Sequence, residues 1–154
     1  MPELSRRVQT FTDSVIRRMT RISDEVDAIN LSQGFPDFPP PKAITDRLRE
    51  VADEGPHQYS VTFGAENFRE ALARKQGRAY GREINPDTEI LVTCGGTEAM
   101  MSAMMTVCNP GDKVIVFSPF YENYGADAIL SGADPIFVPL VPPTFDFDRN
   151  VLED

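Results

Sequence analysis

The segment Ile90-Leu-Val-Thr-Cys-Gly-Gly-Thr-Glu-Ala-Met100 carries the main indication of the fold. Its first four residues have the composition of a strand, and two glycines lead from them into a helical stretch over residues 97–108. Backbone N–H groups at the start of a helix are unpaired and lie at the positive end of its dipole, so such a turn can bind a phosphate group. Gly95 and Gly96 allow a close backbone approach, and Thr97 adds a hydroxyl. The same three residues also suit a tight turn in which Thr97 only caps the helix.

Two further apolar runs, residues 114–117 and 136–140, follow this segment, with helical composition between them at residues 121–130. The order strand, helix, strand, helix, strand predicts an α/β fold with a mostly parallel, doubly wound sheet. Three strands make a small sheet for such a fold, and a further helix is predicted to begin near the last residues, with Asp148 as its N-cap. We therefore expect a fold that is truncated at its carboxyl end.

The first part of the chain is predicted to be helical with one structured loop. Apolar residues recur at steps of three and four over residues 11–29, which indicates an amphipathic helix. Several prolines and Gly34 in residues 30–41 exclude a helix and predict an extended, turning segment. Residues 42–52 and 65–80 are predicted helices, and Gly81 ends the second.

A second candidate segment, Val116-Phe-Ser-Pro-Phe-Tyr-Glu-Asn-Tyr-Gly125, follows the next predicted strand. In open α/β sheets, ligands bind outside the carboxyl ends of the strands, so we expect this segment and the double glycine to share one crevice. Tyr121 or Phe120 could stack there on a flat ligand ring, although both also suit ordinary aromatic packing.

The composition excludes several classes of protein. The formal net charge of −9 argues against a surface that binds nucleic acid or anionic lipid, and no apolar segment is long enough to span a membrane. Two cysteines without C-x-x-C spacing and no secretory signal favour a cytoplasmic protein. Because His57 is the only histidine and no cysteine cluster has zinc spacing, we expect no metal site.

Four segments, taken in order, resemble the class I/II aminotransferases of fold type I. They are INLSQGFPDFPPP (29–41), HQYSVTFG (57–64), ILVTCGGTEAM (90–100) and NPGDKVIVFSPFYENY (109–124). The likeness extends from about residue 29 to residue 140 and is strongest to the branch with kynurenine, glutamine and methionine aminotransferases. It implies pyridoxal 5'-phosphate as cofactor, an amino acid and a 2-oxo acid as substrates, and a homodimer.

The resemblance also implies roles for five residues. Gly96 and Thr97 match positions whose backbone and side chain bind the cofactor phosphate. Tyr121 matches the aromatic residue that stacks on the pyridine ring, and Tyr59 matches the tyrosine that reaches the cofactor phosphate of the partner subunit. Gly34 matches the glycine beside the substrate carboxylate. Residues 1–41 then correspond to an arm, helix and substrate loop of the small domain, and residues 42–154 to the first part of the large, cofactor-binding domain.

The Schiff-base lysine of this family comes later than the segments present here, and so does the arginine that binds the substrate carboxylate. Lys42, Lys75 and Lys113 match no catalytic position, so we assign no catalytic residue and expect the chain alone to be inactive. A carbon–sulfur lyase or another enzyme of the same fold remains an alternative, as does a non-catalytic domain that binds a phosphorylated ligand or a partner. The sequence does not identify the amino-acid substrate.

Overall fold

The computed structural model of the chain describes residues 3–55 and 57–153. The chain forms two compact units. The first unit consists of Met1–Ser14 and Thr93–Asp154, and the second of Val15–Val92. The predicted division at residues 41 and 42, which refers to the domains of the longer family members, stays a prediction.

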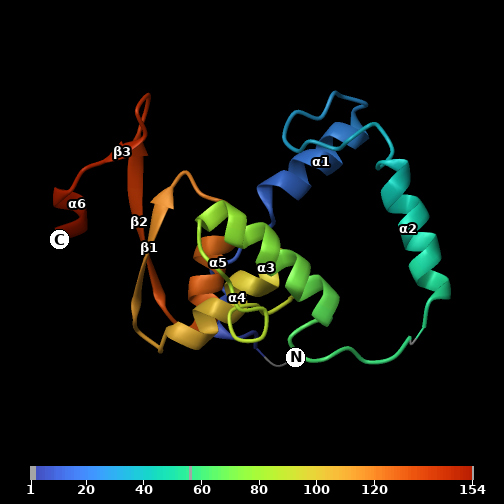
Figure 1. Ribbon diagram of the computed structural model, residues 1–154. Helices are drawn as coiled ribbons and strands as arrows, with labels where there is room; N and C mark the ends of the chain where they lie inside the picture. The colour runs from blue at the N-terminus through green and yellow to red at the C-terminus, as the bar shows by residue number, and fades with distance from the viewer. Residues whose placement is uncertain (1–2, 56, 154) are drawn as a thin grey trace. The chain divides into compact units, whose positions relative to one another are not determined.

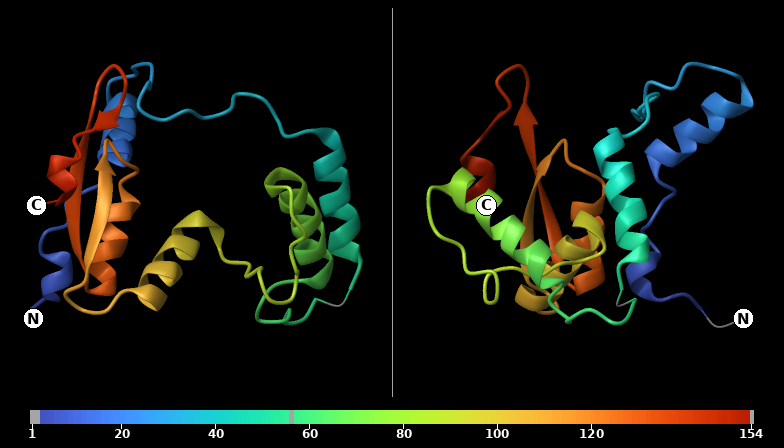
Figure 2. Two further views of the ribbon diagram at one scale, coloured as in Figure 1. Left: turned by 60° about the vertical axis from the view of Figure 1, so that its left-hand side comes forward. Right: turned by 45° about the vertical axis from the view of Figure 1, so that its right-hand side comes forward.

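The first unit is built on a parallel pair of strands. Strand β1 (Lys113–Ser118) pairs with β2 (Asp134–Val141) in a register that runs from Lys113 opposite Asp134 to Ser118 opposite Pro139. Helix α5 (Asn123–Ser131) connects the strands and packs against both, as Figures 1 and 2 show. The two strands and the intervening helix predicted from the sequence are confirmed, with ends shifted by one or two residues.

Short elements complete this unit. Strand β3 (Asp146–Phe147) pairs with β2 antiparallel, so the observed sheet has the order β1-β2-β3. The 3₁₀ helix η1 (Arg6–Val8) contacts α5, and Arg7 Nη1 donates a hydrogen bond of 3.2 Å to the carbonyl of Leu130. Helix α6 (Asn150–Glu153) begins near the predicted position, where Asp148 Oδ1 accepts the backbone N–H of Asn150 at 2.9 Å.

The core of the first unit consists of small and β-branched side chains. Val116, Ala128, Ala133 and Val138 are buried, and Val138 is 0% exposed. Helix α5 approaches the sheet closely at Gly125, where an added Cβ would lie 3.3 Å from the ring of Phe137. Because Phe137 also stacks on Phe120 at 5.1 Å, the segment after β1 is tied to β2.

The strand predicted over residues 90–93 is wrong. These residues are extended but belong to no strand of the sheet. The N–H of Val92 donates to the carbonyl of Phe63 at 3.0 Å, and the N–H of Gly95 donates to the carbonyl of Thr93 at 2.8 Å. A strand needs a neighbouring ladder of backbone groups, and none of the described segments supplies one to residues 90–93.

The second unit contains the three helices predicted from periodicity. They are α1 (Val15–Glu25), α2 (Lys42–Asp53) and α3 (Glu66–Tyr80). Helix α1 is shorter than the predicted span at both ends, while α2 and α3 agree with the predictions within one residue. Gly81 adopts a left-handed conformation after α3 with φ +65°, as expected of a glycine that ends a helix.

Arg69 on α3 connects the loop before this helix to the turn after it. Its side chain is buried, with Nε donating to the carbonyl of Gly64 at 3.0 Å and Nη1 donating to the carbonyl of Pro86 at 2.6 Å. Nη1 also pairs with Asp87 Oδ1 at 2.7 Å. The loop that contains Tyr59 therefore ends at a residue, Gly64, that a buried guanidinium holds in place.

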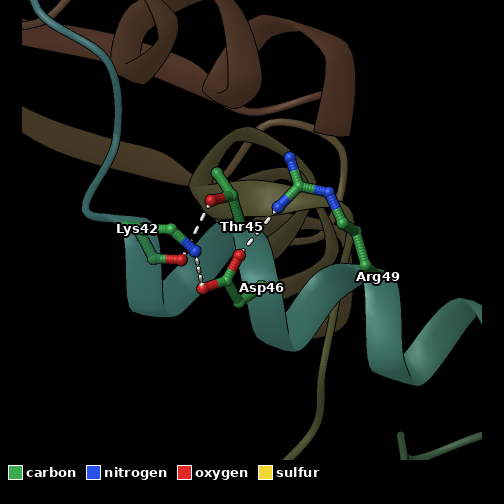
Figure 3. Close-up of polar contacts among 4 residues, drawn as sticks. All are labelled: Lys42, Thr45, Asp46 and Arg49. Atoms are coloured by element: carbon green, nitrogen blue, oxygen red, sulfur yellow. Dashed lines mark hydrogen bonds and ion pairs between the residues drawn. The ribbon is translucent and has the colours of Figure 1, made fainter.

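Polar contacts on α2 lie at its surface, as Figure 3 shows. Lys42 Nζ pairs with Asp46, and Arg49 Nη1 donates to the other carboxylate oxygen of Asp46 at 2.8 Å. Thr45 donates to the carbonyl of Lys42 at 2.9 Å. Lys42 thus belongs to an exposed ion-pair cluster. Each such pair contributes less than about 1 kcal/mol to the stability of the fold.

Candidate functional site

The double glycine lies at the start of helix α4 (Gly95–Val107), which belongs to the first unit. Gly95 has φ +86°, a conformation that a glycine adopts without strain, so it makes the turn into the helix. An added Cβ at Gly95 or Gly96 would meet nothing within 4 Å. The space beside both residues is therefore open as far as the described residues are concerned.

The first turn of α4 has unused hydrogen-bond donors. Cys94 precedes the helix, has no capping side-chain bond, and donates its own N–H to the carboxylate of Glu98. Within the described residues, no acceptor is found for the backbone N–H groups of Gly96 and Thr97. Two free N–H groups beside open space at a helix N-terminus form a set of donors that suits a phosphate oxygen.

Tyr121 lies after the carboxyl end of β1, where its ring is exposed and meets Tyr124 edge to face with centroids 5.9 Å apart. Both tyrosines line an open, mostly apolar pocket of about 440 Å³, together with Met100 and Met104 of α4. An aromatic face beside an open pocket is available for a flat ligand.

A hydrogen bond joins the two candidate segments. Asn123, the first residue of α5, donates from Nδ2 to Thr97 Oγ1 at 2.7 Å. Ser14 donates to the carboxylate of Glu122 at 2.8 Å to Oε1 and 3.0 Å to Oε2. The bond between Thr97 and Asn123 shows that the double-glycine turn lies next to the segment after β1, while the predicted sharing of one crevice stays a prediction.

The other two predicted site residues belong to the second unit. Tyr59 is fully exposed in the loop before α3, and Gly34 is exposed in the loop between α1 and α2 with nothing within 4 Å of an added Cβ. Their predicted roles concern a partner subunit and a substrate, so these roles stay predictions.

Three polar residues were missed by the sequence reasoning. Asn123 and Glu122 lie inside the quoted segment after β1. Their position as polar residues at the start of a predicted helix could have indicated that they make such contacts. Arg69 looks like any other charged residue of α3 in the sequence, and its burial became visible with the structure.

The three lysines lie on β1, α2 and α3, and none of them adjoins a candidate residue of the first unit in the sequence. Lys113 is the first residue of β1 and thus lies at the opposite end of the strand from Tyr121. Lys75 is exposed on α3, and Lys42 is paired on α2. Among the described residues, no group of three metal-ligating side chains is found, and no helix is long and apolar enough to cross a membrane.

Comparisons with known proteins identify the family of the chain. The sequence profile of the family "Aminotransferase class I and II" matches residues 26–154. The methionine aminotransferase of Escherichia coli strain K12 is 38% identical over 135 residues, which cover 88% of this chain and 35% of that protein. Human kynurenine–oxoglutarate transaminase 1 is 37% identical over 124 residues, covering 79% of this chain and 29% of the relative.

Solved structures give the same result. The crystal structure of a methionine aminotransferase from Escherichia coli matches 98% of this chain with a TM-score of 0.88 and 35% sequence identity. N-succinyldiaminopimelate aminotransferase from Mycobacterium tuberculosis matches 97% with a TM-score of 0.86 and 32% identity. The chain spans 40% of each of these two structures. Its mixed α/β architecture is thus that of the corresponding part of a fold-type I enzyme, and the chain belongs to the class I and II aminotransferase family.

Proposed function

We propose that the chain contributes part of the cofactor site of a pyridoxal 5'-phosphate-dependent aminotransferase, which transfers an amino group between an amino acid and a 2-oxo acid. The observation that carries the proposal is the first turn of α4, where the N–H groups of Gly96 and Thr97 have no acceptor within the described residues. Open space at Gly95 and Gly96 adjoins these donors. Backbone donors at a helix N-terminus fit the phosphate of this cofactor.

In this proposal the chain's own residues bind and orient the cofactor. Gly96 and Thr97 hold its phosphate, and Tyr121 covers one face of its ring beside the pocket after β1. Tyr59 reaches the phosphate in a partner subunit of a homodimer, and Gly34 lies beside the substrate carboxylate. Pyridoxal phosphate, when bound, supplies the electron sink that makes amino-acid chemistry possible.

The relatives act on different amino acids, since they are named for methionine, kynurenine and N-succinyldiaminopimelate. We therefore propose the reaction class and no single substrate. Since the chain spans 35% of the methionine aminotransferase and contains no lysine that matches the family's Schiff-base position, we expect no transaminase turnover from the 154 residues alone. A cytoplasmic location is part of the same proposal.

The proposal is tested by measuring the binding of pyridoxamine 5'-phosphate and of pyridoxamine by calorimetry. These ligands have no aldehyde, so they do not react with lysines, and the ratio of their affinities isolates the phosphate. We expect Gly96→Val to lower this ratio by about tenfold or more, because its side chain would occupy the open space beside the free N–H groups. Thr97→Ala is expected to cost less, about 0.5–1.5 kcal/mol, as for one hydrogen bond.

Ala103→Val is the matched control, because it places the same side chain at an exposed position two turns further along α4. An unchanged ratio in Gly96→Val would show that the double glycine makes only a turn. Formation of a 2-oxo acid by the purified chain, above a mock purification, would contradict the expected lack of turnover.

A further inference from the structure

The hydroxyl of Thr97 is used differently from the hydroxyls of the other helical threonines that the structure describes. Three of these threonines donate their hydroxyl proton to a carbonyl of the preceding turn: Thr20 to Ile16 at 3.0 Å, Thr45 to Lys42 at 2.9 Å, and Thr106 to Ser102 at 2.7 Å. Thr20 also accepts, from Nδ2 of Asn30 at 3.1 Å. Thr97 accepts from Nδ2 of Asn123 in the same way, but its own proton has no acceptor among the described residues. Among the helical threonines that the structure describes, Thr97 is therefore the one whose proton is left unused.

A threonine hydroxyl has one proton and two lone pairs. With Nδ2 of Asn123 at 2.7 Å on one lone pair, the proton is directed away from Asn123. Within the described residues, no acceptor of the Thr97 hydroxyl proton is found. Since the N–H groups of Gly96 and Thr97 also lack an acceptor among the described residues, the hydroxyl adds a third donor to this pair.

We propose that Asn123 is a positioning residue for the cofactor phosphate. It orients the hydroxyl of Thr97 so that the proton remains available to the phosphate oxygen held by the first turn of α4. This inference rests on the proposed function, because it assumes that the phosphate binds at Gly96 and Thr97. It adds a residue to that site that does not touch the ligand itself and acts through Thr97.

The direction of the amide is the essential point. If the carbonyl Oδ1 faced Thr97, the hydroxyl would donate to Asn123 and its proton would be lost to the phosphate. An aspartate at position 123 imposes this second arrangement, because an ionised carboxylate only accepts hydrogen bonds. Asn123→Ala removes the donor and leaves the hydroxyl free to rotate.

The test is a double-mutant cycle on the 154-residue chain, read as the ratio of the affinities for pyridoxamine 5'-phosphate and pyridoxamine. We expect Asn123→Ala to lower the ratio by about threefold to tenfold, the effect of one oriented hydrogen bond. Asn123→Asp should lower it further. In a Thr97→Ala background, Asn123→Ala should have no additional effect, because the hydroxyl that it positions is gone.

Two comparisons separate this role from a structural one. A general loosening of the fold would weaken the binding of pyridoxamine as much as that of pyridoxamine 5'-phosphate, so the ratio of the two affinities would not change. Asn109→Ala is the matched control, because it removes an amide that contacts Asp112 before the start of β1 and should leave the ratio unaltered. Asn123→Asp in the Thr97→Ala background measures the effect of the added charge alone.

The outcomes distinguish the inference from the function on which it rests. If the natural chain binds both ligands equally, the phosphate site itself is wrong and the inference falls with it. If the natural chain prefers the phosphate but Asn123→Ala has no effect, the site stands and the role of Asn123 is refuted. The inference is also refuted if Asn123→Ala is equally harmful with and without the Thr97 hydroxyl.

Discussion

The first and second units of the chain are stabilised by different kinds of contact. In the described part of the first unit, Val116, Ala128, Ala133 and Val138 are buried around a parallel pair of strands. In the described part of the second unit, the buried residues are Ala73 and Arg69. Burial of apolar area contributes about 25 cal/mol per Å² to the free energy of folding. Apolar packing therefore stabilises the first unit, whereas the second unit depends more on other contacts.

The second unit relies on a few specific backbone positions. Arg69 binds the carbonyls of Gly64 and Pro86, and the N–H of Val92 binds the carbonyl of Phe63 next to Gly64. Loss of one partner in such a contact is costly, because a buried polar group without a hydrogen bond destabilises the fold by more than the bond itself stabilises it. The second unit is therefore more sensitive to changes at single positions than a unit held by apolar packing. We therefore expect single substitutions to be most damaging where these contacts meet.

The largest effect is expected for Gly64→Ala. Gly64 has φ +103°, and an added Cβ would lie 2.4 Å from Cγ2 of Val92. Strain from the positive φ and the overlap should together cost about 3 kcal/mol or more. The readout is amide hydrogen exchange of residues 57–92, with residues 113–141 as the internal reference.

Gly81→Ala and Gly34→Ala are matched controls for this prediction. Gly81 has φ +65° with open space around it, so its substitution should cost about 1 kcal/mol for the backbone alone. Gly34 has open space without a positive φ, so Gly34→Ala should be nearly neutral. Exchange in Gly64→Ala no faster than in Gly81→Ala would contradict the predicted contact with Val92.

A smaller loss is expected for Arg69→Leu, which leaves the carbonyls of Gly64 and Pro86 without their donor. We expect about 2–3 kcal/mol, measured by the same exchange experiment. Asp87 is 73% exposed in its pair with Arg69, so Asp87→Ala should cost less than about 1 kcal/mol. Equal losses in the two variants would show that the ion pair, rather than the carbonyl bonds, holds this unit together.

The same contrast explains what the sequence could predict. Helices α2 and α3 follow from periodicity and from local stop signals such as Gly81, which depend on neighbouring residues alone. The predictions of strands β1 and β2 are confirmed, and the two strands form because each pairs with the other. The predicted strand at residues 90–93 is wrong because its composition was suitable but its partner is absent from the described sheet.

For the candidate site, the sequence predicted the segments and missed their connections. Gly96, Thr97 and Tyr121 lie in runs with a local physical signature, a double glycine before a helix and an aromatic after a strand. Their binding roles stay predictions. The role proposed for Asn123 depends on a contact across 26 positions of the chain, and the burial of Arg69 involves contacts with two separate loops. No local pattern encodes such contacts.

After Gly64→Ala and Arg69→Leu, the third and smallest of the main effects is expected within the core of the first unit, at Asp127. This residue of α5 is 3% exposed, and its Oδ2 has no hydrogen-bond partner among the described residues. Burial raises the pKa of the Asp127 carboxyl above its ordinary value. The folded chain therefore holds this proton more tightly than the unfolded chain. Asp127 destabilises the fold least at a pH below its ordinary pKa, and the destabilisation grows as the pH rises through the raised pKa.

We accordingly expect Asp127→Ala to stabilise the first unit at pH 7 by about 1 kcal/mol, the cost of an unsatisfied buried acceptor. The gain should shrink as the pH falls toward the ordinary carboxyl value of about 4, where the natural side chain is protonated. Urea unfolding at pH 7 and at pH 4.5 measures the difference, with the exposed Asp134→Ala as reference. A gain for Asp127→Ala that is the same at both pH values would mean that removal of the side chain, and not the ionisation of a buried carboxyl, causes the stabilisation. A loss of stability at pH 7 would show that Asp127 makes a favourable contact in solution and that the first unit, like the second, depends on a polar group.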